Sequence, residues 1–390
     1  MADRSFLDWP FFDERHRRLA VEVENWAALH LGPVSHVARS SPRNVPGECI
    51  ALVRALGDAG FLRHAVADPE IEESRLDVRS LCLIRETLAY HSGLADFAFA
   101  MQGLGSGPVS LFGSDALRRE WLPRIAAGQS VAAFAISERD AGSDIAAIQA
   151  SARRDGESWI LDGEKTWISN AGIAGDYVIF CRTPELGERA FGAFLVSAES
   201  MGLVSTADLE ISSPHVLGSL RLERCRVPAE RMIGAPGMGL RVALATLDVF
   251  RPTVGAAALG FARRAMDEAV RRVRDRHVFG QPLAEHQLTR ARIADMAVDV
   301  DASALFVYRA AWAHDTAGGR TTREAAMAKL FATEAAQRVI DSAVQLFGGR
   351  GVLQGEAVEA LYREIRALRI YEGTSEIQQL VIAGQILPKV

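Results

Sequence analysis

Cysteine is scarce in this sequence, and its spacing supports no cysteine-based site. Among 390 residues the only cysteines are Cys49, Cys82, Cys181 and Cys225, and no two of them form a Cys-x-x-Cys pair. This spacing indicates neither a disulfide framework nor a zinc site, and no metal is expected. We predict that the four side chains are small buried hydrophobic groups.

An excess of basic residues is also lacking. The chain has 44 Lys and Arg against 49 Asp and Glu, which gives a formal net charge of −5. Proteins that bind nucleic acid usually present a basic surface to the phosphates. The charge balance therefore argues against a nucleic-acid partner.

No uninterrupted apolar run is long enough to span a bilayer. The first ten residues contain acids and have no apolar core of the length found in signal peptides. We therefore expect a cytoplasmic protein without a membrane span. Its length and its hydrophobic content of 49% are sufficient for more than one core.

The rhythm of apolar residues divides the chain into three parts. Residues 1–129 and 237–390 show mainly helical spacing, whereas residues 130–236 contain short strand-like runs. This order predicts an α+β protein with an N-terminal helical domain, a central β domain and a C-terminal helical bundle. The segment 330–346 is apolar enough to bury both faces of a helix, so we expect a homo-oligomer.

Individual elements can be placed within these parts. The clearest predicted helices are Leu19–Leu29, Cys49–Leu56, Val78–Tyr90, Ala116–Ile125, Leu240–Arg274, Leu288–Thr316, Thr322–Phe347 and Ser375–Leu387. The predicted strands are 158–163, 177–182 and 190–196, the first running into a turn at Gly163. Residues 112–115 are expected to end one helix, and Ser114 or Asp115 is expected to cap the helix that follows.

The stretch from Arg369 to Gln378 places one carboxylate, Glu372, on a glycine turn just before a helix. Gly373 allows a sharp turn, and Ser375 is predicted as the N-cap with Gln378 as its capping-box partner. By itself, Glu372 could be a carboxylate that only stabilises the helix dipole.

This stretch closely resembles the Tyr-Glu-Gly-Thr signature of the acyl-CoA dehydrogenases. By this resemblance, Glu372 is the catalytic base that removes the α-proton of a thioester while FAD takes the β-hydride. Gly373 would lie in the substrate site, and Thr374 and Glu376 would contact the cofactor. The family fold matches the predicted order of helical, β and helical parts.

A strand-like run that ends in a polar loop resembles the flavin-binding segment of the family. The run contains Ile136, Ser137 and Glu138, and the loop continues to Gly142, Ser143 and Asp144. Alone it reads as a surface loop. By the resemblance, Ile136, Ser137 and Ser143 bind the cofactor, and Ser143 also faces substrate. Arg139-Asp140 replaces the Pro-Gly that is usual in the family.

Trp167, Ile168 and Ser169 offer an indole and a hydroxyl two residues apart, which we predict on one side of a strand. A buried core tryptophan would be a common cause of the same pattern. The three residues resemble the Trp-Ile-Thr or Trp-Ile-Ser segment that packs on the flavin in the family.

Asp248 and Arg251 open the long helix predicted after residue 240. By the resemblance, both lie near the thioester. Part of the family has its catalytic glutamate immediately before this arginine, but Phe250 stands there and cannot remove a proton. Glu372 is thus the one candidate for the base.

Two further segments resemble parts of the family that contact FAD. Arg276, Phe279, His286 and Gln287 match an Arg-x-x-Phe-Gly segment followed by Gln, and arginine suits a pyrophosphate. Gln345, Gly348 and Gly349 match a Gln-x-x-Gly-Gly turn that reaches the FAD of a neighbouring subunit. Without the resemblance, the second segment would be an ordinary helix-ending turn. By the resemblance, this contact with a neighbouring subunit implies a dimer or a homotetramer.

The resemblance implies an enzyme of fatty acid metabolism that oxidises an acyl-CoA to the trans-2-enoyl-CoA and passes electrons to an electron-transfer flavoprotein. Gly384 occupies a position where the family often has an arginine near CoA. A thioester on an acyl carrier protein therefore stays open as the substrate. An oxidase that uses O₂, a non-catalytic flavoprotein and a nucleic-acid-binding relative stay open as well, although the negative charge argues against the last of these.

Overall fold

The computed structural model describes residues 3–31, 44–71, 74–317 and 320–387. They form two compact units, each assembled from separate parts of the chain. Of the described residues, the helical unit contains 3–31, 77–96, 248–317 and 320–387, and the sheet unit contains 44–71, 74–76 and 97–247. The class is α+β, as predicted from the sequence.

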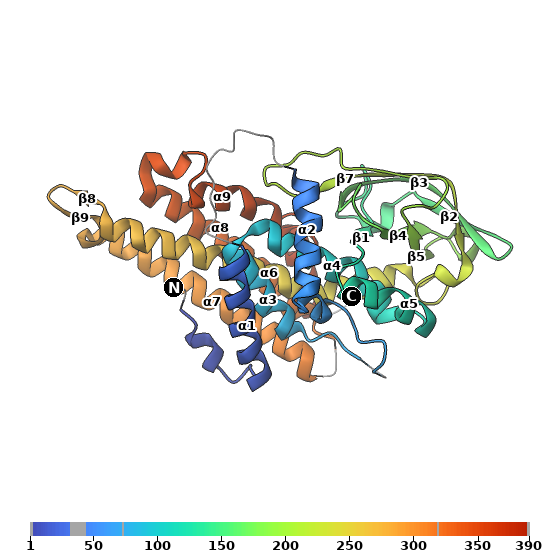
Figure 1. Cartoon of the computed structure of the whole chain (residues 1–390), viewed down its shortest axis with the longest axis horizontal. Coiled ribbons are helices and arrows are strands. Elements are labelled where there is room, and N and C mark those ends of the chain that lie inside the picture. Colours follow the sequence, from blue (N-terminus) through green and yellow to red (C-terminus); the bar gives the residue numbers. More distant parts are fainter. Residues whose placement is uncertain (1–2, 32–43, 72–73, 318–319, 388–390) are drawn as a thin grey trace. The chain divides into compact units, whose positions relative to one another are not determined.

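The sheet unit is built on seven strands (Figure 1). They are β1 Ala132–Ala135, β2 Ser151–Asp155, β3 Ser158–Ser169, β4 Asp176–Arg182, β5 Phe191–Ser197, β6 Leu203–Thr206 and β7 Leu217–Pro228. The strand order is β1-β4-β2-β3-β7-β6, with β5 paired to β4. β1 and β2 run parallel to β4, and the other pairs are antiparallel.

Two helices in this unit match predictions, α2 Val45–Asp58 and α5 Asp115–Ala126. Ser114 caps α5, because its side chain accepts a hydrogen bond from the backbone N–H of Leu117. Trp121 of α5 belongs to the same buried apolar cluster as Phe180 of β4 and Leu195 of β5. This cluster fixes one face of the sheet through burial of apolar surface.

The turn predicted at Gly163 is wrong. β3 continues through this residue and stays paired with β7 on both sides, with a register shift between Leu161 and Gly163. Gly163 has φ +137°, and a Cβ there would lie 2.7 Å from the Cα of Ala150. Gly163 therefore lies at a β-bulge inside β3, and the strand does not end there as the sequence suggested.

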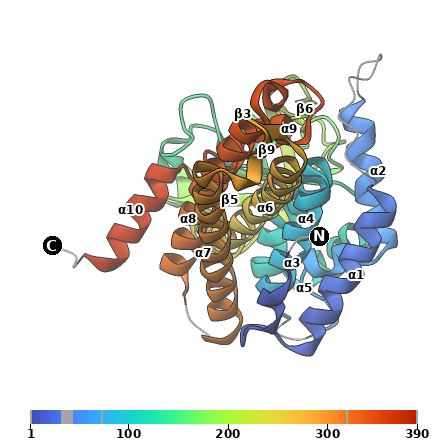
Figure 2. The same ribbon diagram turned by 90° about the vertical axis from the view of Figure 1, so that its left-hand side faces the viewer.

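The helical unit contains seven helices or parts of helices besides the first turn of α4 among its described residues (Figures 1 and 2). They are α1 Glu14–His30, α3 Val78–His91, α6 Gly239–Asp275 from residue 248, α7 Gln287–Ala317, α8 Thr322–Phe347, α9 Ala357–Leu368 and α10 Ser375–Ile386. α7 packs against α3 and α8, α8 packs against α9 and α10, and α1 packs against α3. α8 is thus central in the C-terminal part of the chain.

The sequence analysis did not anticipate α9, and it anticipated only the end of α4 Gly93–Phe112. α4 is apolar around most of its circumference and contains internal glycines and Pro108, so it lacks the periodicity of a surface helix. The four cysteines are free and buried, as predicted. Among the described residues, one helix, α6, is long and apolar enough to cross a membrane, but 83% of its apolar window is buried inside the protein, as in an ordinary core helix.

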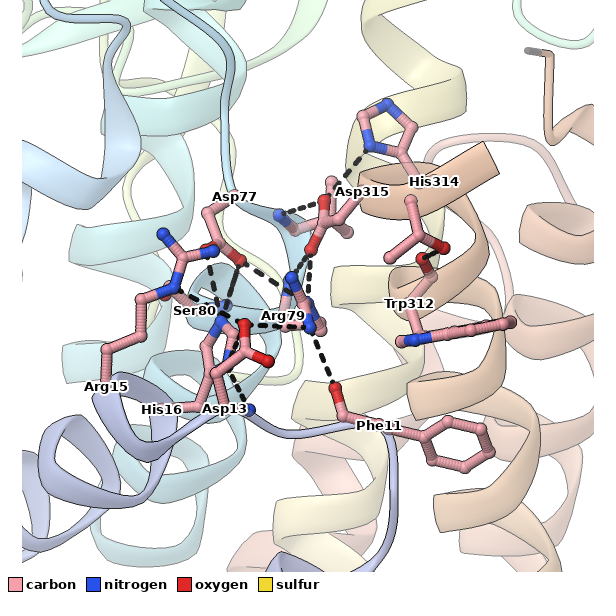
Figure 3. A network of polar contacts seen from close by, with 12 residues as sticks. Phe11, Asp13, Arg15, His16, Asp77, Arg79, Ser80, Trp312, His314 and Asp315 are labelled. Atoms are coloured by element: carbon pink, nitrogen blue, oxygen red, sulfur yellow. Dashed lines mark hydrogen bonds and ion pairs between the residues drawn. The ribbon is translucent and has the colours of Figure 1, made fainter. Parts of the chain in front are cut away.

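A polar network joins the starts of α1 and α3 within the helical unit (Figure 3). The imidazole of His16 is fully buried, and its Nε2 lies 3.1 Å from Oδ2 of Asp77. The backbone N–H of Asp13 donates to the other ring nitrogen, Nδ1, at 3.0 Å. His16 can therefore donate from Nε2 to the carboxylate.

The same network reaches the end of α7. Arg79 is buried, and its Nε donates to Oδ2 of Asp315 at 2.9 Å. The backbone N–H of Val78 donates to Oδ1 of Asp315 at 2.9 Å, so this carboxylate also satisfies the start of α3. Burial alone would raise the pKa of Asp77, but its contacts with His16 hold that pKa well below its usual range.

We expect Asp77→Asn to lower the free energy of unfolding by about 1–3 kcal/mol at pH 7, the usual cost of losing a charged hydrogen-bond partner. The folded-state pKa of Asp77 is depressed. Its stabilising contribution is therefore present above the unfolded value of about 3.9 and is lost as the pH falls below it. Urea unfolding should show a large difference from wild type that persists from pH 7 to about pH 4 and shrinks at lower pH. The exposed Glu22 of α1, changed to Gln, is the control; an equal loss in both variants would contradict the assignment.

Candidate active site

Glu372 lies in the connection between α9 and α10, on a turn of unusual backbone geometry. Glu372 has φ +54° and Gly373 has φ +93°, so two consecutive residues adopt the left-handed region. This conformation costs an L-residue free energy but suits glycine. The predicted sharp turn at Gly373 is confirmed.

The predicted N-cap is wrong by one residue. Thr374 caps α10, because its Oγ1 accepts from the backbone N–H of Ile377 at 3.4 Å. Ser375 is the first residue of the helix, and its hydroxyl donates to Glu334 instead. The side chain of Gln378 makes no capping box and turns toward the carbonyls of the Glu372 turn.

The Glu372 carboxylate has one oxygen, Oε2, that is buried and has no hydrogen-bond partner among the described residues. Burial raises the pKa of Glu372, and Asp96 adds to this effect, while Arg85, Lys329 and Arg251 oppose it. A carboxyl group with a raised pKa and a free oxygen is suited to take a proton near neutral pH.

Arg85 of α3 is the cation with the largest influence on Glu372. It is itself buried and donates to both carboxylate oxygens of Asp96, at 2.8 Å each, and to Oγ1 of Thr253 at 3.0 Å. The carboxylate therefore balances the guanidinium. The sequence analysis did not single out this pair, although a charge inside the apolar helix 78–91 was a usable signal, because buried charges need partners.

Asp248 and Arg251, predicted near the substrate, are connected to the turn. Nε of Arg251 donates to the backbone carbonyl of Glu372 at 3.4 Å, and its Nη1 donates to Oδ1 of Asp248 at 3.0 Å. The hydroxyl of Thr322 donates to the other oxygen of Asp248 at 2.6 Å. α6 and the start of α8 thus orient this arginine.

Lys329 and Gln378 complete the surroundings of the turn. Nζ of Lys329 donates to the carbonyl of Gly373 at 2.8 Å. Nε2 of Gln378 donates to the carbonyls of Gly373 and Glu372 at 2.9 and 3.2 Å. Burial lowers the pKa of Lys329 to about 8, although the charge of Glu372 acts in the opposite direction. The sequence analysis missed Lys329, which lies within the apolar pattern of a long helix.

The sheet unit brings two of the predicted flavin segments together. The backbone N–H of Thr166 donates to the carbonyl of Ser137 at 3.0 Å. Nζ of Lys165 donates to the carbonyl of Ile136 at 3.1 Å and to Oε1 of Glu138 at 2.7 Å. Because Lys165 is buried, these bonds hold the segment that contains Ile136 and Ser137 against the end of β3.

Trp167 is exposed, with 57% of its surface accessible, so it is not a core tryptophan. Its φ is +59°, and the pairing of β3 with β7 shifts between Lys165 and Ile168. The regular alternation assumed for Trp167 and Ser169 therefore does not hold. At this bulge the indole of Trp167 points to the surface, while Ile168 stays buried. Ser143, in the polar loop, is also exposed. An exposed aromatic plate beside a polar loop fits a flat cofactor.

Arg276 and Phe279 lie at a two-stranded hairpin, β8 His277–Val278 with β9 Gln281–Pro282. Phe279 is 97% exposed at its tip, and its ring centroid lies 6.2 Å from that of His286. Gln287 begins α7 immediately afterwards. Figure 1 shows the hairpin beyond the ends of α6 and α7.

Gln345, Gly348 and Gly349 lie at the end of α8, near the same end of the helices, since Arg272 of α6 donates to the carbonyl of Phe347. A Cβ at either glycine would meet nothing within 4 Å, so the backbone there is open to a ligand.

The hairpin and the glycine turn are distant from Glu372 within one copy. Gly348 follows Lys329 by 19 positions of one helix, which corresponds to about 28 Å at 1.5 Å per residue. Lys329 contacts the Glu372 turn, so the glycine turn lies about one helix length away from the base. Thr374 and Glu376, in contrast, follow Glu372 directly in the chain. The structure therefore divides the predicted cofactor residues of this unit into two groups.

Comparison with known proteins assigns the whole chain. Family models described as the N-terminal, middle and C-terminal domains of acyl-CoA dehydrogenase match residues 13–129, 133–223 and 237–387. The probable acyl-CoA dehydrogenase FadE25 of Mycobacterium tuberculosis (strain ATCC 25618 / H37Rv) is 36% identical over 381 residues, which cover 96% of this chain and 95% of that protein.

Solved structures agree with this assignment. Butyryl-CoA dehydrogenase from Megasphaera elsdenii has a TM-score of 0.88 at 27% identity, over 97% of this chain and 99% of that one. The prolyl acyl carrier protein oxidase AnaB has a TM-score of 0.86 at 25% identity, over 96% and 99%. Related acyl-CoA dehydrogenase structures contain FAD or FADH₂. The chain belongs to the acyl-CoA dehydrogenase family, whose cofactor is FAD.

Proposed function

We propose that this protein removes two hydrogens from an acyl-CoA to form the trans-2-enoyl-CoA, with Glu372 as the catalytic base. The observation that carries the proposal is the Glu372 carboxylate, which combines a buried, unpartnered oxygen with a raised pKa on a strained turn. The catalysed change breaks the Cα–H and Cβ–H bonds and forms a C=C double bond. Glu372 takes the α-proton.

The chain's own groups supply position and electrostatics. A thioester α-proton is a weak acid, so the developing negative charge needs preorganised donors as the base acts. The backbone N–H of Glu372 is one donor for the thioester carbonyl in this proposal. FAD, when bound, accepts the β-hydride, and the protein orients it and excludes water.

Two sets of residues are proposed to hold FAD. The sheet unit would supply the loop, strand and indole residues Ile136, Ser137, Ser143, Trp167, Ile168 and Ser169. The helical unit would supply Thr374 and Glu376 beside the base, and the distant group Arg276, Phe279, His286, Gln287, Gln345, Gly348 and Gly349. The separation of about 28 Å along α8 supports the proposal that the distant group serves the FAD of another subunit in a homodimer or homotetramer.

Substrate contacts and the electron acceptor complete the proposal. Ser143, Asp248, Arg251 and Gly373 would face the thioester, and an electron-transfer flavoprotein would reoxidise the flavin in the cytoplasm. Reoxidation by O₂ is the competing outcome, and hydrogen peroxide formed in step with turnover would show it.

A thioester on an acyl carrier protein is the second candidate substrate. Similarity to a structure named as an acyl carrier protein oxidase favours it, as does Gly384 in place of an arginine. Anaerobic bleaching of the flavin band near 450 nm by a panel of acyl-CoAs, compared with the same acyl groups on a carrier protein, separates the two. Reduction by the carrier-bound acyl group alone would reject CoA as the carrier.

Glu372→Gln should bind FAD as wild type does and lose flavin reduction by at least a thousandfold, because the amide cannot take the α-proton. The measurement is the anaerobic rate of bleaching, with FAD content from the absorbance spectrum of the purified protein. Glu22→Gln, which changes an exposed carboxylate of α1 that has no place in the proposed cofactor or substrate site, is the control for the loss of a carboxylate. A Glu372→Gln protein that bleaches at a near wild-type rate would remove Glu372 from the base role.

Asp96→Asn should change the pH profile of the rate of flavin reduction. The acid limb of this profile, where the rate falls because the base becomes protonated, should move to lower pH. Asp96 raises the pKa of Glu372, whereas its partner Arg85 lowers it, so removing the negative charge leaves the arginine unopposed. The pKa of the base then falls, and ionised base persists at lower pH. Asp299→Asn, which removes a carboxylate bonded to Arg338 on another face, is the control and should keep the wild-type profile. A limb that moves to higher pH would contradict this assignment.

A further inference from the structure

The turn that carries Glu372 is held by donors that the family signature does not include. Glu372 and Gly373 are both in the left-handed region, and a non-glycine residue persists there only when its surroundings fix it. The turn also directs two consecutive carbonyl oxygens toward the protein interior, where they require donors. Their partners therefore decide whether the turn keeps its shape.

Lys329 and Gln378 are the fully buried partners of these carbonyls. Lys329 donates to Gly373 at 2.8 Å, and one amide nitrogen of Gln378 donates to both carbonyls. The orientation of the Gln378 amide follows from this contact, because its oxygen in the same place would face two carbonyl oxygens. Arg251 adds a longer bond of 3.4 Å to Glu372.

Lys329 also acts on the carboxylate through its charge. It lies among Arg251 of α6, Glu334 of its own helix, Glu376 of α10 and Glu372 itself, and these are the charged groups that influence its titration. Its ammonium group lowers the pKa of Glu372. One residue thus joins the backbone of the turn to the ionisation of its side chain.

We infer that Lys329 and Gln378 are positioning residues that hold the Glu372 turn in its catalytic shape. This inference rests on the proposed base role of Glu372. Neither residue needs to touch the substrate or the cofactor. Both act through the two backbone carbonyls, and Lys329 acts in addition through its positive charge.

Lys329→Met should slow flavin reduction at least tenfold and move its acid limb to higher pH. The thioether neither donates to Gly373 nor stabilises the carboxylate, so the turn loosens and the pKa of Glu372 rises. Hydrogen exchange, measured by mass spectrometry on the peptide 369–378, should become at least tenfold faster. Lys329→Arg keeps a charged donor and should restore most of the rate and the wild-type limb.

Gln378→Leu separates the hydrogen bonding of the turn from the effect of the Lys329 charge. It also provides a test of the hydrogen bonding if Lys329→Met folds poorly. It removes two hydrogen bonds and no charge, so exchange in the peptide 369–378 should accelerate while the acid limb stays in place. Arg338→Met, on α8 with a half-exposed side chain bonded to Asp299, should change neither quantity.

The exchange measurement needs no turnover, so it tests the anchoring separately from the base assignment. If Glu372→Gln remains active while Lys329→Met accelerates exchange, the proposed function fails and the anchoring stands. If Lys329→Met shows wild-type exchange and a wild-type acid limb, the inference is overturned.

Discussion

The hydrogen bonding of two backbone carbonyls, those of Glu372 and Gly373, is the constraint on which the candidate site depends. A left-handed glutamate is intrinsically unfavourable, so the turn requires compensation from outside itself. Donors from three helices supply it: Arg251 of α6, Lys329 of α8 and Gln378 of α10. The packing of α8 against α10 therefore has a direct consequence for the shape of the site.

The pKa of the Glu372 carboxylate is set by opposing effects of burial and of the charged side chains around it. Three cations surround Glu372, yet its pKa is raised, because burial outweighs their attraction and Asp96 compensates Arg85. A single unpaired buried arginine would have held the carboxylate ionised and weakened it as a base. The Arg85–Asp96 pair is thus better understood as an adjustment of the base than as a source of stability, since buried ion pairs contribute little net stability.

In the sheet unit, too, a buried lysine holds a segment of irregular backbone through hydrogen bonds. Lys165, buried at the end of β3, binds the carbonyl of Ile136 and the carboxylate of Glu138, and the adjacent bulge exposes Trp167. In both units a buried lysine fixes a segment of irregular backbone. Irregular backbone can present groups to a ligand that a regular strand or helix would use for its own hydrogen bonds.

The sequence by itself determined the class, the main helices and the residues at Glu372, because helix periodicity and short motifs are local properties. It found only the end of α4, whose apolar residues lack a period, and placed the α10 cap one residue late, because Ser375 and Thr374 are both good caps. Only the tertiary structure identified Arg85, Asp96, Lys329 and the role of Gln378. These residues are far from Glu372 along the chain or have another local explanation, and only the packing of separate helices brings their charges and donors to one turn.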